Sequence, residues 1–136
     1  MSERNKIIAE TQRWLLYAER DLEAAKVLAG SGGNFAQQVC FCCQQAAEKG
    51  LKGGLIFLQI EFPFRHDLEL LRTHFPQDWQ CSRLSNLEEL TEWAVESRYP
   101  SAFKEASTTD AELALQQAEI ILEVVKRDLA QQGFPV

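Results

Sequence analysis

The most informative segment of this chain is Phe41-Cys42-Cys43-Gln44-Gln45-Ala46-Ala47-Glu48-Lys49-Gly50-Leu51-Lys52. Small and apolar residues recur at helical spacing through this segment and through the longer run 35–60, and they leave only a narrow polar face. A helix that is apolar on most sides is normally buried. We therefore predict that residues 35–60 form a central helix, whose small residues let neighbouring backbones approach closely.

Four side chains of the polar face emerge in one line, because they lie at helical offsets 0, 3, 4 and 7: Gln45, Glu48, Lys49 and Lys52. Glu48 and Lys52 also have the order that favours an i,i+4 ion pair, worth about 0.2–0.5 kcal/mol. One interpretation is a solvent-exposed row that contains this pair, and spacing alone favours it. The other is a site where the two lysines bind a phosphate, which the amide and the carboxylate orient.

Turn signals and apolar periodicity predict further helices on both sides of this segment. An apolar stripe predicts a helix over 4–29, which Gly30–Gly33 ends. Asn34 is a candidate N-cap for residues 35–60, and Gln37 can complete a capping box with it. The first half of the chain is therefore expected to form two long helices.

The second half of the chain carries three more helix starts. Asp67 is predicted to cap a short helix over 67–75. The capping box Ser85–Glu88 opens a helix that ends before Pro100, and the box Thr109–Glu112 opens the last helix. No run shows the alternation that is typical of a strand. The sequence therefore predicts an all-α fold, an up-and-down antiparallel bundle of four main helices plus one short helix.

Composition and charge predict a single domain over residues 1–136. The chain is 46% hydrophobic and carries 14 Lys and Arg against 20 Asp and Glu, a formal net charge of −6. This balance excludes a disordered tail, and it argues against indiscriminate coating of nucleic acid, which needs a positive excess. No run approaches the roughly 20 apolar residues of a membrane span. The N-terminus does not resemble a signal peptide, and we expect a cytoplasmic protein.

The four cysteines are Cys40, Cys42, Cys43 and Cys81. Three of them within four positions make a poor disulfide framework and fit a reducing compartment. Cys40 and Cys43 would share a helix face, but the sequence offers neither a second pair nor a histidine at ligand spacing. We interpret them as small buried hydrophobes and predict no metal site. The two histidines also lack the Glu-x-x-His spacing of a di-iron bundle.

The quoted segment resembles the central motif of the HEPN domain (higher eukaryotes and prokaryotes nucleotide-binding), in which an aromatic residue and small residues precede a Gln-Ala-x-Glu-Lys-x-x-Lys core. Four further motifs follow the order of that family: Trp14 with Ala18, Asp21-Leu22 and Ala25; His66-Asp67-Leu68 with Leu71; Arg98-Tyr99-Pro100; and Asp110-Ala111. Each motif alone is weak, but five in register from Trp14 to Leu129 are specific.

The resemblance implies a bundle of four or five helices, in agreement with the periodicity. It implies a nucleotide- or RNA-phosphate-binding module that forms a homodimer and acts with a separate minimal nucleotidyltransferase, as in toxin–antitoxin pairs. From the length we expect no fused second domain, and no cofactor is expected. The nucleotide-binding residues that the resemblance implies are Gln45, Glu48, Lys49, Lys52, His66, Arg98 and Tyr99.

One branch of the HEPN family consists of metal-independent ribonucleases, marked by an Arg that precedes a His by four to six intervening residues. The corresponding positions are 59–61 before His66 and 67–69 before His74, and none of them is Arg. We therefore assign no catalytic residue and favour a binding module over an enzyme. The alternatives that stay open are a helical subunit that binds only a partner protein, and a ribonuclease with a degenerate Arg/His site drawn from Arg65, His66 and Arg98.

Four of these side chains also have a purely structural interpretation. His66 can help Asp67 to cap its short helix, and this is favoured over a ligand contact. Arg98 lies at a helix end, where the helix dipole also favours a cation. Trp14 and Trp93 are interpreted as core or dimer-face aromatics rather than as base-stacking platforms.

Overall fold

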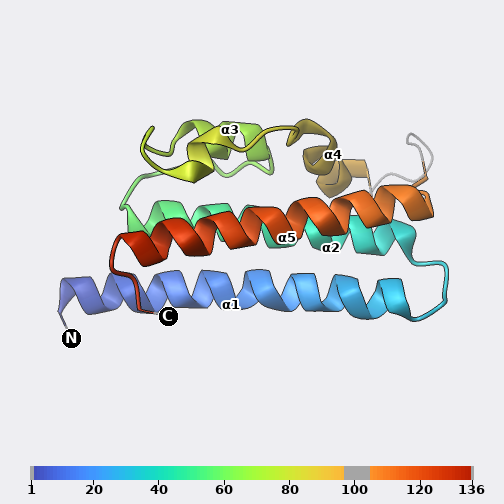
Figure 1. The fold of residues 1–136 in the computed structure, drawn as a ribbon, viewed down its shortest axis with the longest axis horizontal. Helices are drawn as coiled ribbons and strands as arrows, with labels where there is room; N and C mark the ends of the chain where they lie inside the picture. Colours follow the sequence, from blue (N-terminus) through green and yellow to red (C-terminus); the bar gives the residue numbers. More distant parts are fainter. Residues whose placement is uncertain (1, 97–104, 136) are drawn as a thin grey trace.

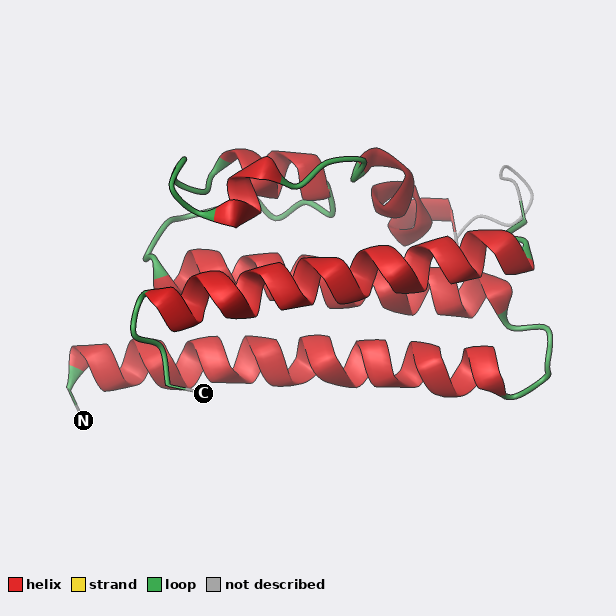
Figure 2. Cartoon of the chain, in the orientation of Figure 1, coloured by secondary structure: helices red, strands yellow, loops and turns green. Residues whose placement is uncertain are grey.

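The chain folds into helices that pack side by side (Figure 1). The structure is a computed structural model that describes residues 2–96 and 105–135. Its elements are α1 (Glu3–Gly30), α2 (Ala36–Phe57), α3 (Leu68–Thr73), the 3-10 helix η1 (Gln80–Arg83), α4 (Glu88–Glu96) and α5 (Thr108–Gln131). Within these ranges every regular element is helical, as Figure 2 shows, so the predicted all-α class is confirmed. None of the described helices combines the length and apolar character that crossing a membrane requires.

Helix α2 lies in the middle layer of the bundle together with α5 (Figure 1). Helix α1 covers one side of this layer, and α3, η1 and α4 cover the other. In Figure 1 the chain runs from left to right through α1, returns to the left through α2, crosses to the right again through α3 and α4, and returns to the left through α5. Because α2 contacts α1, α3, α4 and α5, the predicted up-and-down bundle and the predicted central helix are both confirmed.

Two glycines of α2 show why this helix tolerates residues that weaken helices. A Cβ atom at Gly50 would collide with Leu122 Cδ2 of α5, and one at Gly53 would lie 3.2 Å from Trp14 Cβ of α1. Glycine costs about 1 kcal/mol of helix propensity relative to alanine. At these positions the missing side chain lets α1 and α5 pack closely against the backbone of α2, and this packing offsets the lost helix propensity.

The start of α2 differs from the predicted capping box. The helix begins at Ala36, its N-cap residue is Phe35, and no side chain caps it. The Gln37 side-chain oxygen instead accepts a hydrogen bond at 2.9 Å from the backbone N–H of Ala106, just before α5. The prediction that Asn34 and Gln37 cap α2 is therefore wrong, because a contact 69 residues away in sequence uses the Gln37 oxygen.

Two other helix starts follow local capping signals. Asp67 caps α3 as predicted, since its Oδ1 accepts a backbone hydrogen bond at 3.2 Å within the first turn. The capping box of α5 is formed by Ser107 and Asp110, so the predicted box Thr109–Glu112 is wrong by two positions. The helix end predicted before Pro100 lies outside the described residues.

Two boundaries are set by left-handed backbone that the sequence patterns did not indicate. Helix α4 begins at Glu88, and Asn86 has a φ of 59°. The first residue after an N-cap must have helical φ, so the predicted box that starts at Ser85 is wrong. Helix α2 ends at Phe57, before the predicted boundary at 60, and Gln59 likewise has a φ of 59°.

A buried carboxylate of α5 holds the start of η1. Asp128 is 3% exposed; its Oδ1 accepts from the backbone N–H of Gln80 at 3.0 Å and its Oδ2 from that of Cys81 at 2.8 Å. The N-cap residue of η1, Trp79, provides no side-chain cap. Asp128 therefore supplies from a distant helix the acceptors that a local cap would otherwise provide.

Candidate functional site

The polar line of α2 is mostly covered by the fold. Glu48 is 6% exposed and Lys52 is 7% exposed, while Gln45 and Lys49 are half-buried. The interpretation of this line as a solvent-exposed row is therefore wrong. The ion pair predicted between Glu48 and Lys52 is present, with Nζ 2.9 Å from Oε2, but it lies inside the bundle.

Glu48 is the centre of a buried hydrogen-bond network. Lys52 Nζ donates to its Oε2, while Gln44 Nε2 lies 3.1 Å and His66 Nδ1 lies 2.8 Å from its Oε1. Burial alone would raise the pKa of Glu48, but the hydrogen bonds from these three side chains outweigh it and hold the pKa below its usual value. An ionised carboxylate only accepts hydrogen bonds, so we assign the proton of this contact to His66 Nδ1.

His66 connects this buried network to the surface. Its side chain is 42% exposed, whereas that of Glu48 is 7% exposed. Gln44 Nε2 also donates to the backbone carbonyl of His66 at 3.1 Å, so both the ring and the backbone of His66 are fastened to α2. The ring therefore binds Glu48 rather than assisting the Asp67 cap. This pairing uses Nδ1 and leaves Nε2 as the ring nitrogen that can meet a ligand.

Lys49 has a different environment from Lys52, although both come from the same line. Its Nζ lies 2.6 Å from Asp21 Oδ2 of α1, and the two side chains are 30% and 27% exposed. Lys49 also lines a surface cleft of about 400 Å³ together with four residues of α1: Glu10, Arg13, Trp14 and Tyr17. Of the two lysines, Lys49 is thus the one that faces a concave surface.

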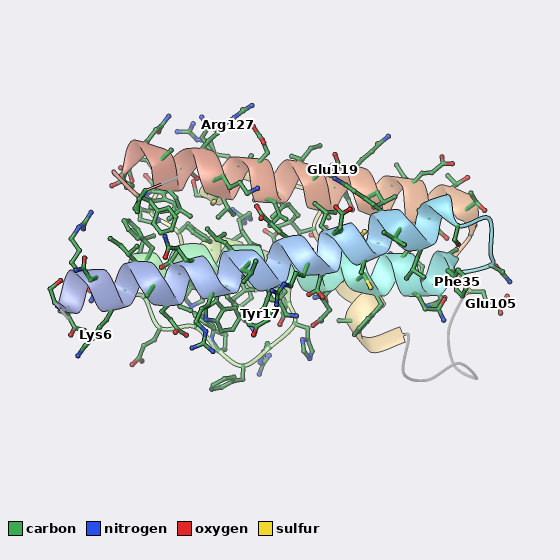
Figure 3. All side chains as sticks on the ribbon, turned by 90° about the horizontal axis from the view of Figure 1, so that it is seen from below. Lys6, Tyr17, Phe35, Glu105, Glu119 and Arg127 are labelled. Atoms are coloured by element: carbon green, nitrogen blue, oxygen red, sulfur yellow. The ribbon has the colours of Figure 1, made fainter. Side chains whose placement is uncertain are left out.

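Two aromatic side chains form an apolar wall of this cleft. Trp14 Nε1 donates to Glu10 Oε1 at 3.2 Å, and the Trp14 ring packs edge-on against Phe62, with ring centroids 6.4 Å apart. Tyr17 is 47% exposed, and the guanidinium carbon of Arg20 lies 5.5 Å from its ring centroid. In Figure 3, Tyr17 is labelled on α1. The cleft is therefore open on its aromatic side.

Arg13 brings a second positive charge to the cleft. Its side chain is 70% exposed, and Nη1 lies 3.8 Å from Glu10 Oε2, too far for a hydrogen bond. Arg13 was not among the predicted site residues, although a signal was present. Residues 10, 13, 14 and 17 have the same helical offsets as the polar line of α2, but of these four only Trp14 was singled out, as a core or dimer-face aromatic.

The remaining predicted residues fall in several places. The Gln45 amide donates to Gln44 Oε1 at 2.8 Å and so extends the buried network. Trp93 is 4% exposed and lies in the core, as predicted, whereas Trp14 is only half-buried. The two other residues that the resemblance implied lie outside the described residues: Arg98 and Tyr99.

Three of the four cysteines are core residues rather than reactive groups, and Cys42 is partly buried. Cys40, Cys43 and Cys81 are fully buried. Burial, with neighbouring thiols, raises the pKa of Cys43 to about 12, and burial together with Asp128 raises the pKa of Cys81. Thiols that stay protonated are poor nucleophiles and poor metal ligands. Within the described ranges, no group of three or more His, Cys, Asp or Glu side chains is arranged to hold a metal ion.

This architecture defines a class of small helical bundles in which a central helix carries a buried Glu–Lys pair beside a charged cleft. Residues 11–128 match the HEPN domain, and the chain belongs to the HEPN family. The resemblance found from the sequence motifs is therefore confirmed. No curated protein sequence matches the chain.

Two solved structures are similar to this chain. TT1696 from Thermus thermophilus is 27% identical, with a TM-score of 0.75, and the match covers 88% of this chain and 98% of that one. ST0689, an archaeal HEPN homologue, is 34% identical, with a TM-score of 0.66, and the match covers 86% of this chain and 95% of that one. Both matches extend over nearly the whole of each relative.

Proposed function

We propose that this HEPN domain binds the phosphate of a nucleotide or an RNA at the cleft beside Lys49. The observation that supports this site most directly is that Lys49 of α2 and Arg13 of α1 line the same concave surface. Two cations that line one cleft favour a phosphate, which accepts charge-assisted hydrogen bonds from both. Glu10 and Asp21 lie beside these two cations, so a phosphate would bind here by competing with their carboxylates for Arg13 and Lys49.

The residues implied by the family resemblance take two roles in this proposal. Lys49 contacts the phosphate, and the further proposed contacts are His66, Arg98 and Tyr99. The others position the site from within the bundle, because Glu48 and Lys52 neutralise each other there and the Gln45 amide extends their network. These positioning residues are Gln45, Glu48 and Lys52.

Calorimetric titration of the chain with ATP and with tripolyphosphate tests the phosphate site. We expect both to bind, and we expect Lys49→Ala and Arg13→Ala each to weaken binding at least tenfold, since a charge-assisted hydrogen bond contributes about 1.5–3 kcal/mol. Lys26→Ala is a matched control, because Lys26 also pairs with a carboxylate of another helix, at 3.8 Å from Glu119. Absence of heat at millimolar ligand, or equal losses for Lys26→Ala and Lys49→Ala, would sink the proposal.

Family membership supports two further proposals about partners. We propose that the domain acts with a separate minimal nucleotidyltransferase, in the manner of a toxin–antitoxin pair, and that it forms a homodimer. A nucleotidyltransferase encoded by the neighbouring gene is the result expected for the first proposal, and an isolated gene speaks against it. Sedimentation equilibrium tests the second, and a monomer at tens of micromolar contradicts it.

A metal-independent ribonuclease is the second candidate function, and one observation favours it. Glu48 orients the His66 imidazole through Nδ1 at 2.8 Å, and the ring is 42% exposed. A carboxylate that fixes a histidine in this way prepares its other nitrogen for general acid–base chemistry. Incubation of labelled RNA in chelator tests this function, with loss of cleavage expected for His66→Gln. Cleavage that survives combined His66→Ala and Arg98→Ala substitution would indicate a contaminant.

A further inference from the structure

We propose that a groove between α5 and the connection from η1 to α4 binds a helix of another protein, one that carries lysines or arginines beside an apolar face. This groove, called the α5 groove below, shares no lining residue with the cleft beside Lys49. The charged surface that continues from it is acidic. The inference therefore goes beyond phosphate binding and does not depend on it.

The α5 groove has a volume of about 270 Å³. Four apolar residues line it, two from the connection and two from α5: Leu84, Leu87, Ile120 and Ile121. Gln117 Nε2 of α5 donates to the backbone carbonyl of Asn86 at 2.9 Å, and this hydrogen bond ties the two walls together. The groove is therefore part of the fold before a partner arrives, so little ordering is needed on binding.

The apolar surface continues along α5 beyond the groove. Leu113 is 47% exposed and Ile120 is 57% exposed, and a spacing of seven residues puts both on one face of the helix. Val124, which is partly buried, continues the same line one turn further on. Figure 1 shows α5 in front of α2, with the connection from η1 to α4 beside it. A straight apolar line of roughly 17 Å along a helix matches a second helix packed alongside it.

An acidic surface borders the α5 groove on the side of α4. Asn86 lines both the groove and a shallow hollow that three glutamates of α4 complete: Glu88, Glu89 and Glu92. All three are exposed, and none of them forms an ion pair with a residue of 2–96 or 105–135. The helix dipole accounts for acidic residues in the first turn of α4, but Glu92 lies one turn further on. This negative charge is available to a basic partner.

Charge decides among the ligands that such a groove could bind. The carboxylates of α4 repel a ligand that carries phosphate. A second copy related by two-fold symmetry would place the glutamates of one chain against the same glutamates of the other. A helix with basic residues beside its apolar face fits both the groove and the acidic surface, and the formal charge of −6 attracts it. Because Arg83 also lines the groove, the partner's basic residues are expected over α4.

A model peptide can test the α5 groove. The probe is an amphipathic helix of about 16 residues, with leucines on one face and lysines beside them, and glutamate replaces every lysine in a matched peptide. Nuclear magnetic resonance spectra of the labelled full chain locate the binding site. We expect the lysine peptide to shift the amide signals of residues 84–92 and 113–124, and the glutamate peptide to shift none of them. Equal shifts with both peptides, or shifts by the lysine peptide only outside these residues, would overturn the inference.

Reversal of the charge on α4 tests the electrostatic part of the proposal. Glu89→Lys combined with Glu92→Lys should weaken the lysine peptide at least tenfold and should allow the glutamate peptide to bind. Glu23→Lys combined with Glu61→Lys is the matched control, because both residues are exposed glutamates outside the groove and the net charge changes equally. It should leave the affinity of both peptides nearly unchanged. Equal losses for the two double variants would reduce the effect to net charge and overturn the inference.

Replacement of an exposed apolar residue tests the groove itself. Ile120→Ser should weaken the lysine peptide about tenfold, because the peptide covers this side chain on binding. Val27→Ser of α1 is the control, since Val27 is 64% exposed against 57% for Ile120, and it should not change the affinity. Far-UV circular dichroism checks that both variants fold. If Ile120→Ser converts a dimer into a monomer, the groove is an interface between copies of this chain, and the inference is overturned.

Discussion

Two rows of four residues in this chain share one helical spacing, and the fold treats them in opposite ways. Residues 10, 13, 14 and 17 form the row on α1, and residues 45, 48, 49 and 52 form the row on α2. On α1 the charged members stay in water, with Arg13 3.8 Å from Glu10. On α2, Glu48 and Lys52 are taken inside and pair at 2.9 Å. Spacing places side chains on a line, but the element that packs against the line decides whether it is structural or open to a ligand.

Lys49 is the residue at which the two rows meet. It belongs to the α2 row by sequence, yet it lines the cleft of the α1 row and pairs with Asp21 of α1. Lys49 and Lys52 are therefore chemically identical groups, one turn apart, with different tasks. Substitutions of the buried Glu48–Lys52 pair should lower stability, whereas substitutions of the residues that line the cleft should weaken ligand binding. The largest effects are expected in the α2 row.

Lys52→Ala should destabilise the protein by about 3–5 kcal/mol, because it leaves the Glu48 carboxylate buried without its cationic partner. Lys49→Ala, which removes a cation of the half-exposed pair, should cost about 1 kcal/mol or less. The free energy of unfolding in urea measures both effects. Equal losses for the two variants would contradict the contrast between the buried Glu48–Lys52 pair and the partly exposed Lys49–Asp21 pair.

Acidification should remove the stability that the ionised Glu48 carboxylate contributes. The pKa of Glu48 is lower in the folded chain than its unfolded value, about 4.3, so its ionisation stabilises the fold above that pH and this contribution is lost as pH falls through the folded pKa. Glu48→Gln should therefore be much less stable than the natural chain at pH 7, with the difference shrinking at about pH 3. Urea unfolding at both pH values measures this, and a constant difference would refute it.

Asp21→Asn should raise phosphate affinity about two- to fivefold. The Asp21 carboxylate lies 2.6 Å from Lys49 Nζ and competes with an incoming anion for the same ammonium group. Calorimetric titration with tripolyphosphate at low salt measures the change. Glu119→Gln, which frees Lys26 in the same way but outside the cleft, serves as the control and should leave affinity unchanged.

Arg13→Ala should change stability by less than about 0.5 kcal/mol, because its side chain is 70% exposed and its contact with Glu10 is long. Its effect on phosphate binding should nevertheless be as large as that of Lys49→Ala. Urea unfolding and calorimetry on the same preparation check both statements. A large loss of stability would place Arg13 among the structural residues.

Apolar periodicity predicted most of this fold. The narrow polar face of residues 35–60 indicated a central helix, and α2 indeed contacts four other helices. Helix starts were less predictable, because Ser107 and Thr109 offer equally good capping signals and only the packed structure selects Ser107. The use of Gln37 by Ala106 could not be foreseen from a local pattern, since the two residues are 69 positions apart.

The sequence predicted which side chains of the candidate site share one row of α2, but not which parts of the chain pack against that row. The offsets of Glu48, Lys49 and Lys52 correctly placed them in one row and predicted the Glu48–Lys52 pair. Which side of that row is covered depends on α1 and on the connection after α2, and no local pattern contains that information. Arg13 and Tyr17 were not predicted, because nothing in the sequence of α1 indicates that Lys49 of α2 lines the same cleft.

The carboxylate of Asp128 has a consequence for the order in which the chain assembles. Helices α1 and α2 are neighbours in sequence and pack extensively, so this hairpin needs only local loop closure. Residues 80 and 81 instead depend on an acceptor 47 or 48 positions later in the chain. During synthesis they emerge long before that acceptor does. We therefore expect the α1–α2 hairpin to form during synthesis. The α3–η1–α4 layer should reach its final packing only after α5 has been synthesised.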